Sequence, residues 1–187
     1  MTKYNALTVT ADGVLRVLQT PCKISQAISI MELRLGVPHP EFKDFIAVWD
    51  TGASSSAISP NVVNALSLVP TGRGISDTAG GSVEVEKYSI NIMLPMNVGF
   101  SSLPVSCNKM KVDVLIGMDI ISQGDFCVTN KGGKTIFSFQ TPSSHTLDFT
   151  KEIEKYKTLH QTWIAHGNNK CPCGSGKRWE QCHGSVV

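Results

Sequence analysis

Two stretches of the chain combine residue types that can do chemistry, and the first is Asp50-Thr51-Gly52, which follows the apolar segment Phe45 to Trp49. An apolar strand would fix the position of a carboxylate at its end, and glycine lets neighbouring backbones approach closely. The threonine hydroxyl can donate hydrogen bonds within such a site. The same tripeptide is common in turns, so taken alone it favours a structural turn over an active site.

The second stretch is the run Cys171 to Gly184, whose metal-binding residue types are Cys171, Cys173, Cys182 and His183. Three thiolates and an imidazole are the ligands that a closed, tetrahedral structural zinc site needs. So short a segment cannot form a core of its own, which favours metal binding over the alternative of a redox or disulfide cluster. Four protein ligands leave no open position, so we expect no catalysis at this zinc.

A motif downstream changes the interpretation of Asp50. Two apolar residues, Leu115 and Ile116, precede Gly117, and this resembles the strand and glycine beneath the catalytic loop of retropepsins. Met118 would then begin the family's short helix, with Asp119 as its cap. Residues from about 15 to 142 therefore resemble the retropepsin-like aspartic protease family, specifically its prokaryotic branch. The supporting stretches are Asp50 to Ser59, Asp113 to Ile121, and Gly124 to Asn130 followed by Thr135 to Phe139.

The resemblance implies a role for each residue of the loop after the strand. Asp50 would be the catalytic residue of an aspartic endopeptidase, which needs no cofactor for catalysis. Thr51 would lock two such loops together across a dimer axis, and Gly52 would present its backbone to a peptide substrate. Ala53 and Ser54 would line the substrate cleft.

The resemblance also draws attention to the stretch Asp77 to Ser82, which lies where family members carry a hairpin flap. Gly80 and Gly81 would form a mobile tip that contacts the substrate and excludes water. An ordinary β-turn is an equally good interpretation of these residues.

Peptide hydrolysis by carboxylates needs two of them, because one deprotonates water while the other protonates the substrate carbonyl. The chain has one Asp-Thr-Gly, since Asp77-Thr78-Ala79 lacks the glycine and the preceding apolar strand. A homodimer would supply the second Asp50 by symmetry. The rival hypothesis is a catalytically inactive dimeric scaffold that uses the fold to bind peptides. A third hypothesis is an enzyme restrained until Met1 to Ile24 is moved or cut.

Viral members of the family commonly carry Asp and Arg at the positions of Ser54 and Met118, paired as an ion bridge. Both charges are absent here. Because both charges are missing together, no single charge is left without its partner. The dimer contacts of the viral enzymes therefore do not transfer directly to this chain.

The pattern of short apolar runs between Gly, Pro, Asn and Ser clusters predicts an all-β body. The expected strands are Gly13 to Leu18, Ala27 to Leu35, Phe45 to Trp49, Ser82 to Leu94, Phe100 to Cys107, Val112 to Ile116, Phe126 to Thr129 and Thr135 to Gln140. Asn130 to Gly133 predicts a hairpin turn. Pro60 to Leu66 predicts a short helix capped by Ser59.

These patterns and the resemblance together predict an all-β fold. Its main part would be a retropepsin-like closed β-barrel, which corresponds to one half of an acid protease. A C-terminal helix and a small zinc knuckle follow. The expected domains are a protease domain over 1–142, a linker and helix over 143–167, and a zinc-binding motif over 168–187. Asp148 can cap this helix, whose apolar residues would cover the body or the knuckle, or form a partner surface. They are Ile153, Tyr156, Leu159 and Trp163, and Gly167 is placed to end the helix.

The C-terminal run closely resembles the SEC-C motif, named for the extreme C-terminus of the SecA preprotein translocase. The resemblance implies that Cys171, Cys173, Cys182 and His183 bind zinc. Such modules often act as adaptors, so a protein partner or the ribosome is implied, although a solvated basic tail explains the composition equally well. Residues 151–187 contain six Lys or Arg and three Asp or Glu.

The 187 residues carry a net charge of +2, and 41% of them are hydrophobic, enough for one main core and a small appendage. The body is close to neutral, so it shows no nucleic-acid footprint. We see no apolar signal segment at Met1 and no run long enough to span a membrane. Scattered thiols and a metal site fit a reducing compartment, so we expect a cytoplasmic protein.

Overall fold

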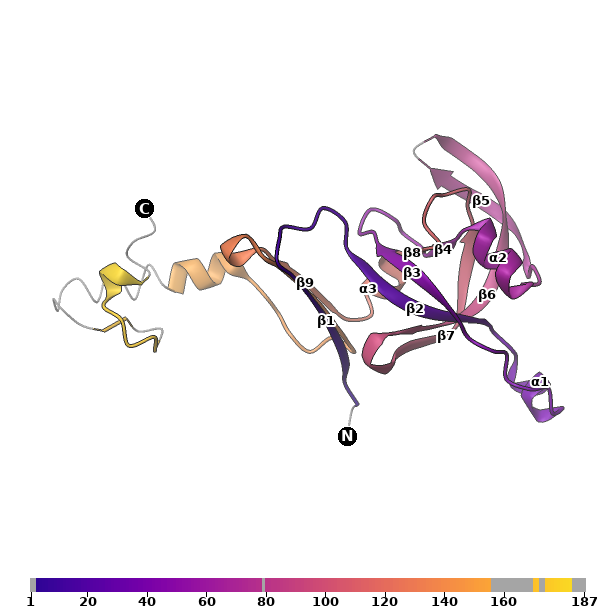
Figure 1. Cartoon of the computed structure of the whole chain (residues 1–187), viewed down its shortest axis with the longest axis horizontal. Helices are drawn as coiled ribbons and strands as arrows, with labels where there is room; N and C mark the ends of the chain where they lie inside the picture. Colours follow the sequence, from indigo (N-terminus) through magenta and orange to yellow (C-terminus); the bar gives the residue numbers. More distant parts are fainter. Residues whose placement is uncertain (1–2, 79, 156–169, 172–173, 183–187) are drawn as a thin grey trace. The chain divides into compact units, whose positions relative to one another are not determined.

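The computed structural model describes residues 3–78, 80–155, 170–171 and 174–182 (Figure 1). The chain divides into two compact units, Met1–Ser144 and His145–Val187.

Within the described residues, six strands of the first unit form a closed barrel in the order β2, β3, β8, β4, β7, β6. Their bounds are β2 (Gln19–Gln26), β3 (Lys43–Trp49), β4 (Ala57–Ile58), β6 (Gly81–Leu94), β7 (Val98–Cys107) and β8 (Val114–Ile116). The barrel closes because β2 pairs with β3 along one part of its length and with β6 at Lys23–Gln26. The expected all-β fold with a closed barrel is therefore confirmed.

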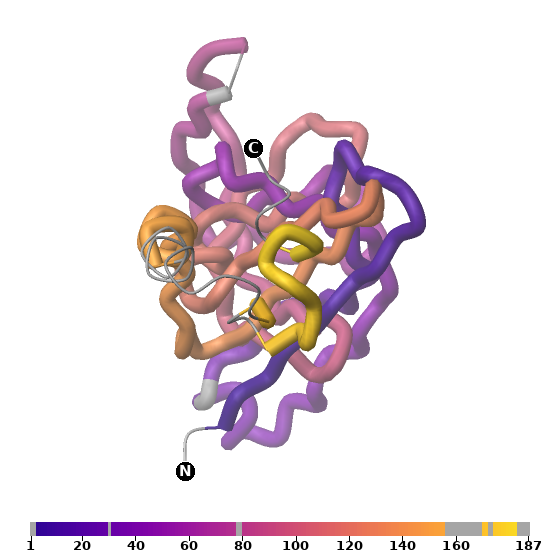
Figure 2. The backbone as a smooth tube through the Cα atoms, turned by 90° about the vertical axis from the view of Figure 1, so that its left-hand side faces the viewer, coloured from indigo at the N-terminus to yellow at the C-terminus, as the bar shows by residue number. Residues whose placement is uncertain are grey.

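The last strand of the seven-stranded sheet, β5 (Gly72–Thr78), lies outside the closed barrel and forms a hairpin with β6. In this hairpin, β5 runs antiparallel to β6 from the Gly72–Lys87 pair to the Thr78–Gly81 pair. Figures 1 and 2 show the hairpin projecting beyond the rest of the barrel. Ile75 is 72% exposed, so this part of the hairpin is not held by the core.

A second sheet packs an aromatic face against the barrel. It has the order β1 (Asn5–Ala11), β10 (Thr135–Thr141), β9 (Asp125–Thr129), and both pairings are antiparallel. The rings of Phe126, Phe137 and Phe139 lie 5.0–5.9 Å from that of Trp49, centroid to centroid. Aromatic pairs at these distances add to the stability that burial provides. The sheet therefore anchors the end of β3.

Short helices connect the strands. They are α1 (Ile30–Arg34), α2 (Pro60–Leu66) and α3 (Met118–Ile121), with 3-10 turns η1 (Pro95–Asn97) and η2 (Lys131–Gly133). The predicted helix over 60–66 is confirmed with Ser59 as its N-cap residue, although the Ser59 side chain makes no capping hydrogen bond. The predicted hairpin turn joins β9 to β10, and Gly132 and Gly133 supply the positive φ angles.

Two of the expected strands were wrong. Residues 13–18 connect β1 to β2 without forming a strand, and 27–35 contain α1. The Ser29 side chain accepts a hydrogen bond from the Glu32 N–H, and the Glu32 carboxylate accepts one from the Ser29 N–H. This capping box starts a helix where apolar residues alone suggested a strand. Strands β1, β2, β4 and β5 were not predicted.

The described part of the second unit begins with a helix. Residues 149–155 are helical, and the Asp148 carboxylate accepts a hydrogen bond from the Lys151 N–H at 3.1 Å. The predicted cap is therefore confirmed. The other predicted helix residues, Tyr156, Leu159, Trp163 and Gly167, lie outside the described residues. In the described residues, no helix has the length and apolar character needed to cross a bilayer.

Candidate functional site

The loop that carries Asp50 is placed by two parallel strands. Strands β3 and β8 pair in parallel up to Trp49 and Ile116, so the residues that follow them, Asp50 and Gly117, emerge side by side. The chain then crosses the end of β8 and returns as β4, which pairs antiparallel with the other edge of β8. The loop of residues 50–56 therefore arches over Gly117.

The base of this loop is rigid. Trp49 is 6% exposed, and its indole N–H donates a hydrogen bond to the Thr20 hydroxyl at 3.0 Å. The Asp50 N–H donates to the Ile116 carbonyl at 2.9 Å, which continues the pairing of β3 with β8. The carboxylate thus starts from a fixed strand end.

The side chain of Asp50 is half-buried and bends back over its own loop. One oxygen, Oδ1, accepts a hydrogen bond from the Gly52 N–H at 2.8 Å. A Cβ atom on residue 52 would lie 3.1 Å from this oxygen, so glycine keeps the turn close to the carboxylate. Thr51 is exposed, and its hydroxyl has no hydrogen-bond partner among the described residues. The site therefore has one held carboxylate and one open hydroxyl beside it.

Glycine is required at position 117 for a different reason. A Cβ atom there would lie 2.6 Å from the Ser55 carbonyl carbon and 2.8 Å from the Ser55 oxygen. The Met118 N–H donates to the Ala53 carbonyl at 2.8 Å, which holds the loop at this short distance. The glycine predicted to lie beneath the loop does so in the structure.

The predicted cap of α3 was wrong. Gly117 occupies the N-cap position, and Asp119 lies in the first turn of the helix. The Asp119 carboxylate instead accepts hydrogen bonds from the main chain and side chain of Ser56. Sequence reasoning missed this pair because the two residues are 63 positions apart.

The structure brings Asp50, Thr51, Gly52, Ala53 and Ser54 together in one loop, whereas Gly80 and Gly81 belong to a separate element. Gly81 pairs with Thr78 at the end of the β5–β6 hairpin and has a φ angle of 110°. The stretch therefore forms the tip of a projecting hairpin, which fits both the flap interpretation and an ordinary β-turn. Close to this tip, Ser76 pairs with Val83, and its hydroxyl accepts a hydrogen bond from the Asn108 side-chain N–H at 3.2 Å.

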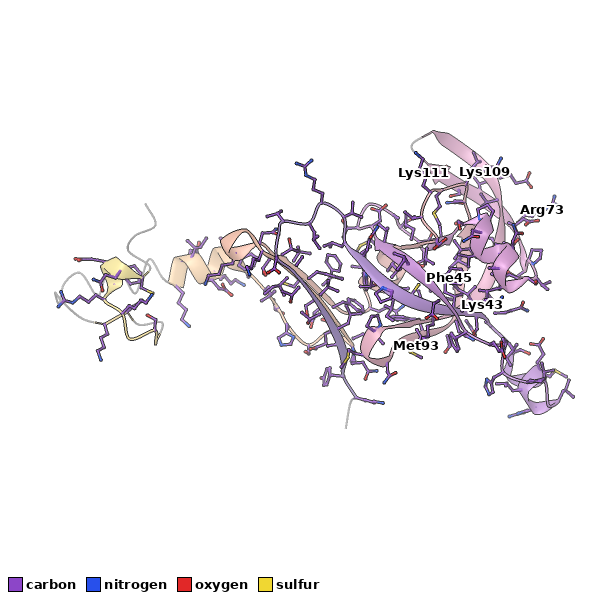
Figure 3. All side chains as sticks on the ribbon, viewed as in Figure 1. Lys43, Phe45, Arg73, Met93, Lys109 and Lys111 are labelled. Carbon is purple, nitrogen blue, oxygen red and sulfur yellow. The ribbon has the colours of Figure 1, made fainter. Side chains whose placement is uncertain are left out.

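A groove of about 490 Å³ lies beside strand β6 of this hairpin. Its lining comes from the hairpin, from the start of α2 and from the segment after β7, namely Pro60, Val83, Glu84, Val85, Glu86, Cys107, Asn108 and Lys109. Figure 3 shows Lys109 beside the projecting hairpin, whose residues line the groove with it. Glu84 and Glu86 line the groove together with Lys109, so the groove carries charges of both signs.

Two buried titratable groups of the barrel have altered pKa values. Burial raises the pKa of the Cys22 thiol to about 12, and the negative charges of Asp113 and Asp44 act in the same direction. Burial also raises the pKa of Tyr88 to about 12, helped by the hydrogen bond that its hydroxyl donates to Glu86. Both groups stay neutral at physiological pH, as expected for core residues.

Two of the four predicted zinc ligands lie in the described residues. Cys171 is 4% exposed, Cys182 is half-buried, and Cys173 and His183 lie outside the described residues. Gly174 and Gly176 have φ angles of 79° and 71°, which turn the chain sharply between the two cysteines. The 3-10 turn η3 (Trp179–Gln181) leads into Cys182. Thiols on a tightly turned loop are suited to zinc.

Two segments of the chain match protein-family models. Residues 42–123 match gag-polyprotein putative aspartyl protease, and residues 168–185 match the SEC-C motif.

Several solved structures are similar to the chain, and three of them are proteases or protease-like domains. A retropepsin-like aspartic protease from Rickettsia conorii has 13% identity and a TM-score of 0.43, with 75% of this chain and 98% of that chain covered. The protease of Simian Foamy Virus (mac) has 14% identity and a TM-score of 0.36, with 56% and 92% covered. The retroviral protease-like domain of Ddi1 from Leishmania major has 17% identity and a TM-score of 0.40, with 66% and 95% covered.

Proposed function

Because the chain belongs to the retropepsin-like aspartic proteases and carries a SEC-C motif, we propose that it is a homodimeric aspartic endopeptidase. The Asp50 residues of two subunits form its catalytic pair, and its substrates are peptides or proteins. The observation that carries this proposal is the half-site itself. A carboxylate is held at a strand end by the Gly52 N–H, and the exposed Thr51 hydroxyl beside it has no partner in the described chain.

The chemistry requires the two carboxyl groups to share one proton. The ionised Asp50 takes a proton from water, and the water oxygen attacks the carbonyl carbon of the peptide bond. The partner subunit's Asp50, in its protonated form, gives its proton to the carbonyl oxygen. The first Asp50, now protonated, gives its proton to the nitrogen of the tetrahedral adduct, a hydroxyl of the adduct returns a proton to the partner subunit's Asp50, and the C–N bond breaks. Since two like charges so close cannot both ionise, activity requires the singly protonated pair and should have a bell-shaped, acid-biased pH profile.

The decisive test is the substitution Asp50→Asn. We expect kcat on a diverse peptide library to fall about 10²- to 10⁴-fold, the usual contribution of a general acid or base. The variant should remain a dimer in sedimentation analysis. Asp44→Asn, which removes an equal charge from an exposed residue of β3, should retain activity. If wild type and Asp50→Asn are equally inert at several pH values while both are dimeric, the protein is a peptide-binding scaffold.

For the second unit, we propose a structural zinc ion bound by Cys171, Cys173, Cys182 and His183. The ion would supply the stability that so short a segment lacks. The sharp turns at Gly174 and Gly176 support this proposal. Metal analysis should find about one zinc per chain. Cys182→Ser should lower that content, whereas Cys127→Ser, which changes a half-buried thiol of β9, should not.

We also propose that the SEC-C motif acts as an adaptor in the cytoplasm, with a protein or the ribosome as its partner. Its exposed cations Lys170, Lys177 and Arg178 support an acidic partner surface. Deleting residues 168–187 should remove co-purifying partners and change the set of cellular substrates. An unchanged set of partners and substrates would argue against an adaptor.

A further inference from the structure

The loop of residues 50–56 is fastened to the chain segment 116–119 at several points. The two main-chain bonds already described, Asp50 N–H to Ile116 and Met118 N–H to Ala53, hold its first half. The second half has a different attachment, through the side chains of Ser56 and Asp119. The main-chain hydrogen bonds fix the position of residues 50–53. The orientation of the whole loop also depends on how its last residue, Ser56, is held.

Ser56 is the buried member of this attachment, with 1% exposure. Its hydroxyl accepts a hydrogen bond from the Gly117 N–H at 3.1 Å and donates one to Asp119 Oδ1 at 2.7 Å. Its main-chain N–H donates to Asp119 Oδ2 at 2.9 Å. Both oxygens of one carboxylate therefore grip one residue of the loop, which fixes orientation as well as distance.

The Asp119 carboxylate is committed to this task. It accepts a third hydrogen bond from the Ile120 N–H at 3.0 Å, so its donors in the described chain are main-chain N–H groups and one hydroxyl. Hydrogen bonds to an ionised acceptor are shorter and stronger than those between neutral groups. Removing the carboxylate would leave the Ser56 N–H and hydroxyl without an acceptor in a buried place, which costs more than the bonds themselves contribute.

We propose that Asp119 is a positioning residue for Asp50. Through Ser56, it sets the tilt of the loop and so the direction in which the Asp50 carboxylate faces the peptide bond. This inference rests on the proposed peptidase function for its catalytic consequence, but the attachment itself is independent of activity. The catalytic geometry tolerates only small displacements, so a loosened loop should lower kcat with little change in KM.

The test combines hydrogen exchange with kinetics on the full-length protein. The variants are Asp119→Ala, Asp119→Asn, Ser56→Ala and the double variant Ser56→Ala/Asp119→Ala. Asp119→Asn keeps the volume of the side chain but can accept from only one of the two Ser56 donors through its oxygen, so it keeps the test possible if the alanine variant fails to fold. Asp113→Ala is the matched control, because this half-buried acid at the other end of β8 accepts a hydrogen bond from Asn61 rather than from the loop.

We expect amide exchange in the 50–56 segment to become at least about tenfold faster in Asp119→Ala, while strand β6 keeps its protection. The same variant should lose at least about tenfold in kcat with KM within about threefold, and Asp119→Asn should lie between it and wild type. The double variant should be no worse than the poorer single variant, because both substitutions break one attachment.

Several outcomes would overturn the proposal. They are unchanged loop exchange in Asp119→Ala and Asp119→Asn, an equal effect of Asp113→Ala, a rise in KM without loss of kcat, or additive effects in the double variant. If the wild-type protein cleaves nothing, the peptidase proposal fails by itself. The exchange data then still decide whether Asp119 fastens the loop.

Discussion

At the scale of single residues, the loop around Asp50 depends on two positions without a side chain, Gly52 and Gly117. Position 117 has no side chain because the Ser55 carbonyl occupies the space that a Cβ atom would need. The N–H of Gly52 donates to the Asp50 carboxylate, and a Cβ atom on residue 52 would crowd the oxygen that accepts this bond. Gly117 therefore lets two main-chain segments approach each other, and Gly52 lets a main-chain N–H approach the Asp50 carboxylate.

Gly117→Ala should move the loop and lower both stability and activity. Overpacking of this kind costs about 1–3 kcal/mol, and the displaced atoms belong to the backbone rather than to a flexible side chain. Urea unfolding and peptide cleavage measure the two effects. Gly72→Ala is the control, because a Cβ atom there meets nothing within 4 Å. Equal stability and activity of the two variants would contradict the close approach.

Cys22 should make the fold sensitive to alkaline pH. Its thiol ionises near 9.0 when unfolded but near 12 when folded, because burial disfavours the thiolate. The raised folded pKa means that its contribution to stability is complete below pH 9 and is lost as the pH rises toward 12. Between these values the free energy of unfolding should fall by about 1.4 kcal/mol per pH unit from this group.

Urea unfolding at pH 8.5, 9.5 and 10.5 tests this expectation. Cys22→Ala should show a shallower decline than wild type across that range, whatever its stability at pH 8.5. Parallel declines would mean that the thiol does not stay protonated in the fold.

The sequence predicted the residues of the site better than their attachments. Asp50, Thr51 and Gly52 are adjacent in the chain, so a local pattern marks them. The grip of Asp119 on Ser56 joins residues 63 positions apart, and nothing local distinguishes this acid from a helix cap. Ser56 lies six residues after Asp50, and Asp119 lies two residues after Gly117. Once β3 and β8 are known to be parallel neighbours, these spacings are enough to predict the contact between Ser56 and Asp119.

At the scale of elements, the barrel depends on one strand with two partners. Strand β2 pairs with β3 through Gln19–Ile24 and with β6 through Lys23–Gln26, and its buried residues include Cys22 and Ile24. The hypothesis that Met1 to Ile24 is a removable restraint conflicts with this arrangement. Removing that segment would take away most of a barrel strand as well as β1.

Deleting residues 1–26 should therefore abolish cooperative unfolding, because both the closure and part of the core are lost. Deleting residues 1–4 should leave the transition intact, since the exposed Tyr4 precedes β1. Thermal unfolding followed by circular dichroism compares the two. A folded and active 27–187 fragment would revive the restraint hypothesis.

Three of the four strands that the sequence missed, β1, β2 and β4, pair with segments far away in the chain, whereas the fourth, β5, forms a local hairpin with β6. In β1 only Leu7 is buried, and β2 contains Pro21, which lacks the N–H that a strand interior normally uses. Strand β3, with Phe45, Ala47 and Trp49 buried in alternation, was predicted because its pattern is local. Apolar alternation identifies half-buried strands, whereas edge pairing between segments far apart leaves little trace in the sequence.

At the scale of the whole molecule, the proposed enzyme exists only as a pair of chains. Activity per subunit should therefore rise with protein concentration until the dimer is saturated. Thr51→Ala should shift the half-maximal concentration upward by about tenfold, since each subunit loses a hydrogen bond across the axis. Thr51→Ser keeps the hydroxyl and should stay close to wild type. Dilution series with a fluorogenic peptide give these curves.

A result in which specific activity is independent of concentration over the measurable range would contradict a reversible dimer. Sedimentation at the same concentrations would then show whether the chain is permanently paired or active alone.

The pairing of β1 with β10 limits the order in which a growing chain can fold. Thr8 and Ser138 face each other across these strands, although 130 positions separate them. During synthesis, β1 therefore has no strand to pair with until nearly the whole first unit has been made. Phe137 and Phe139, which press on Trp49 beneath Asp50, arrive equally late. A nascent chain of the proposed enzyme thus carries Asp50 before it has the sheet that packs on Trp49, so we expect an unfinished copy to be unable to cut its neighbours.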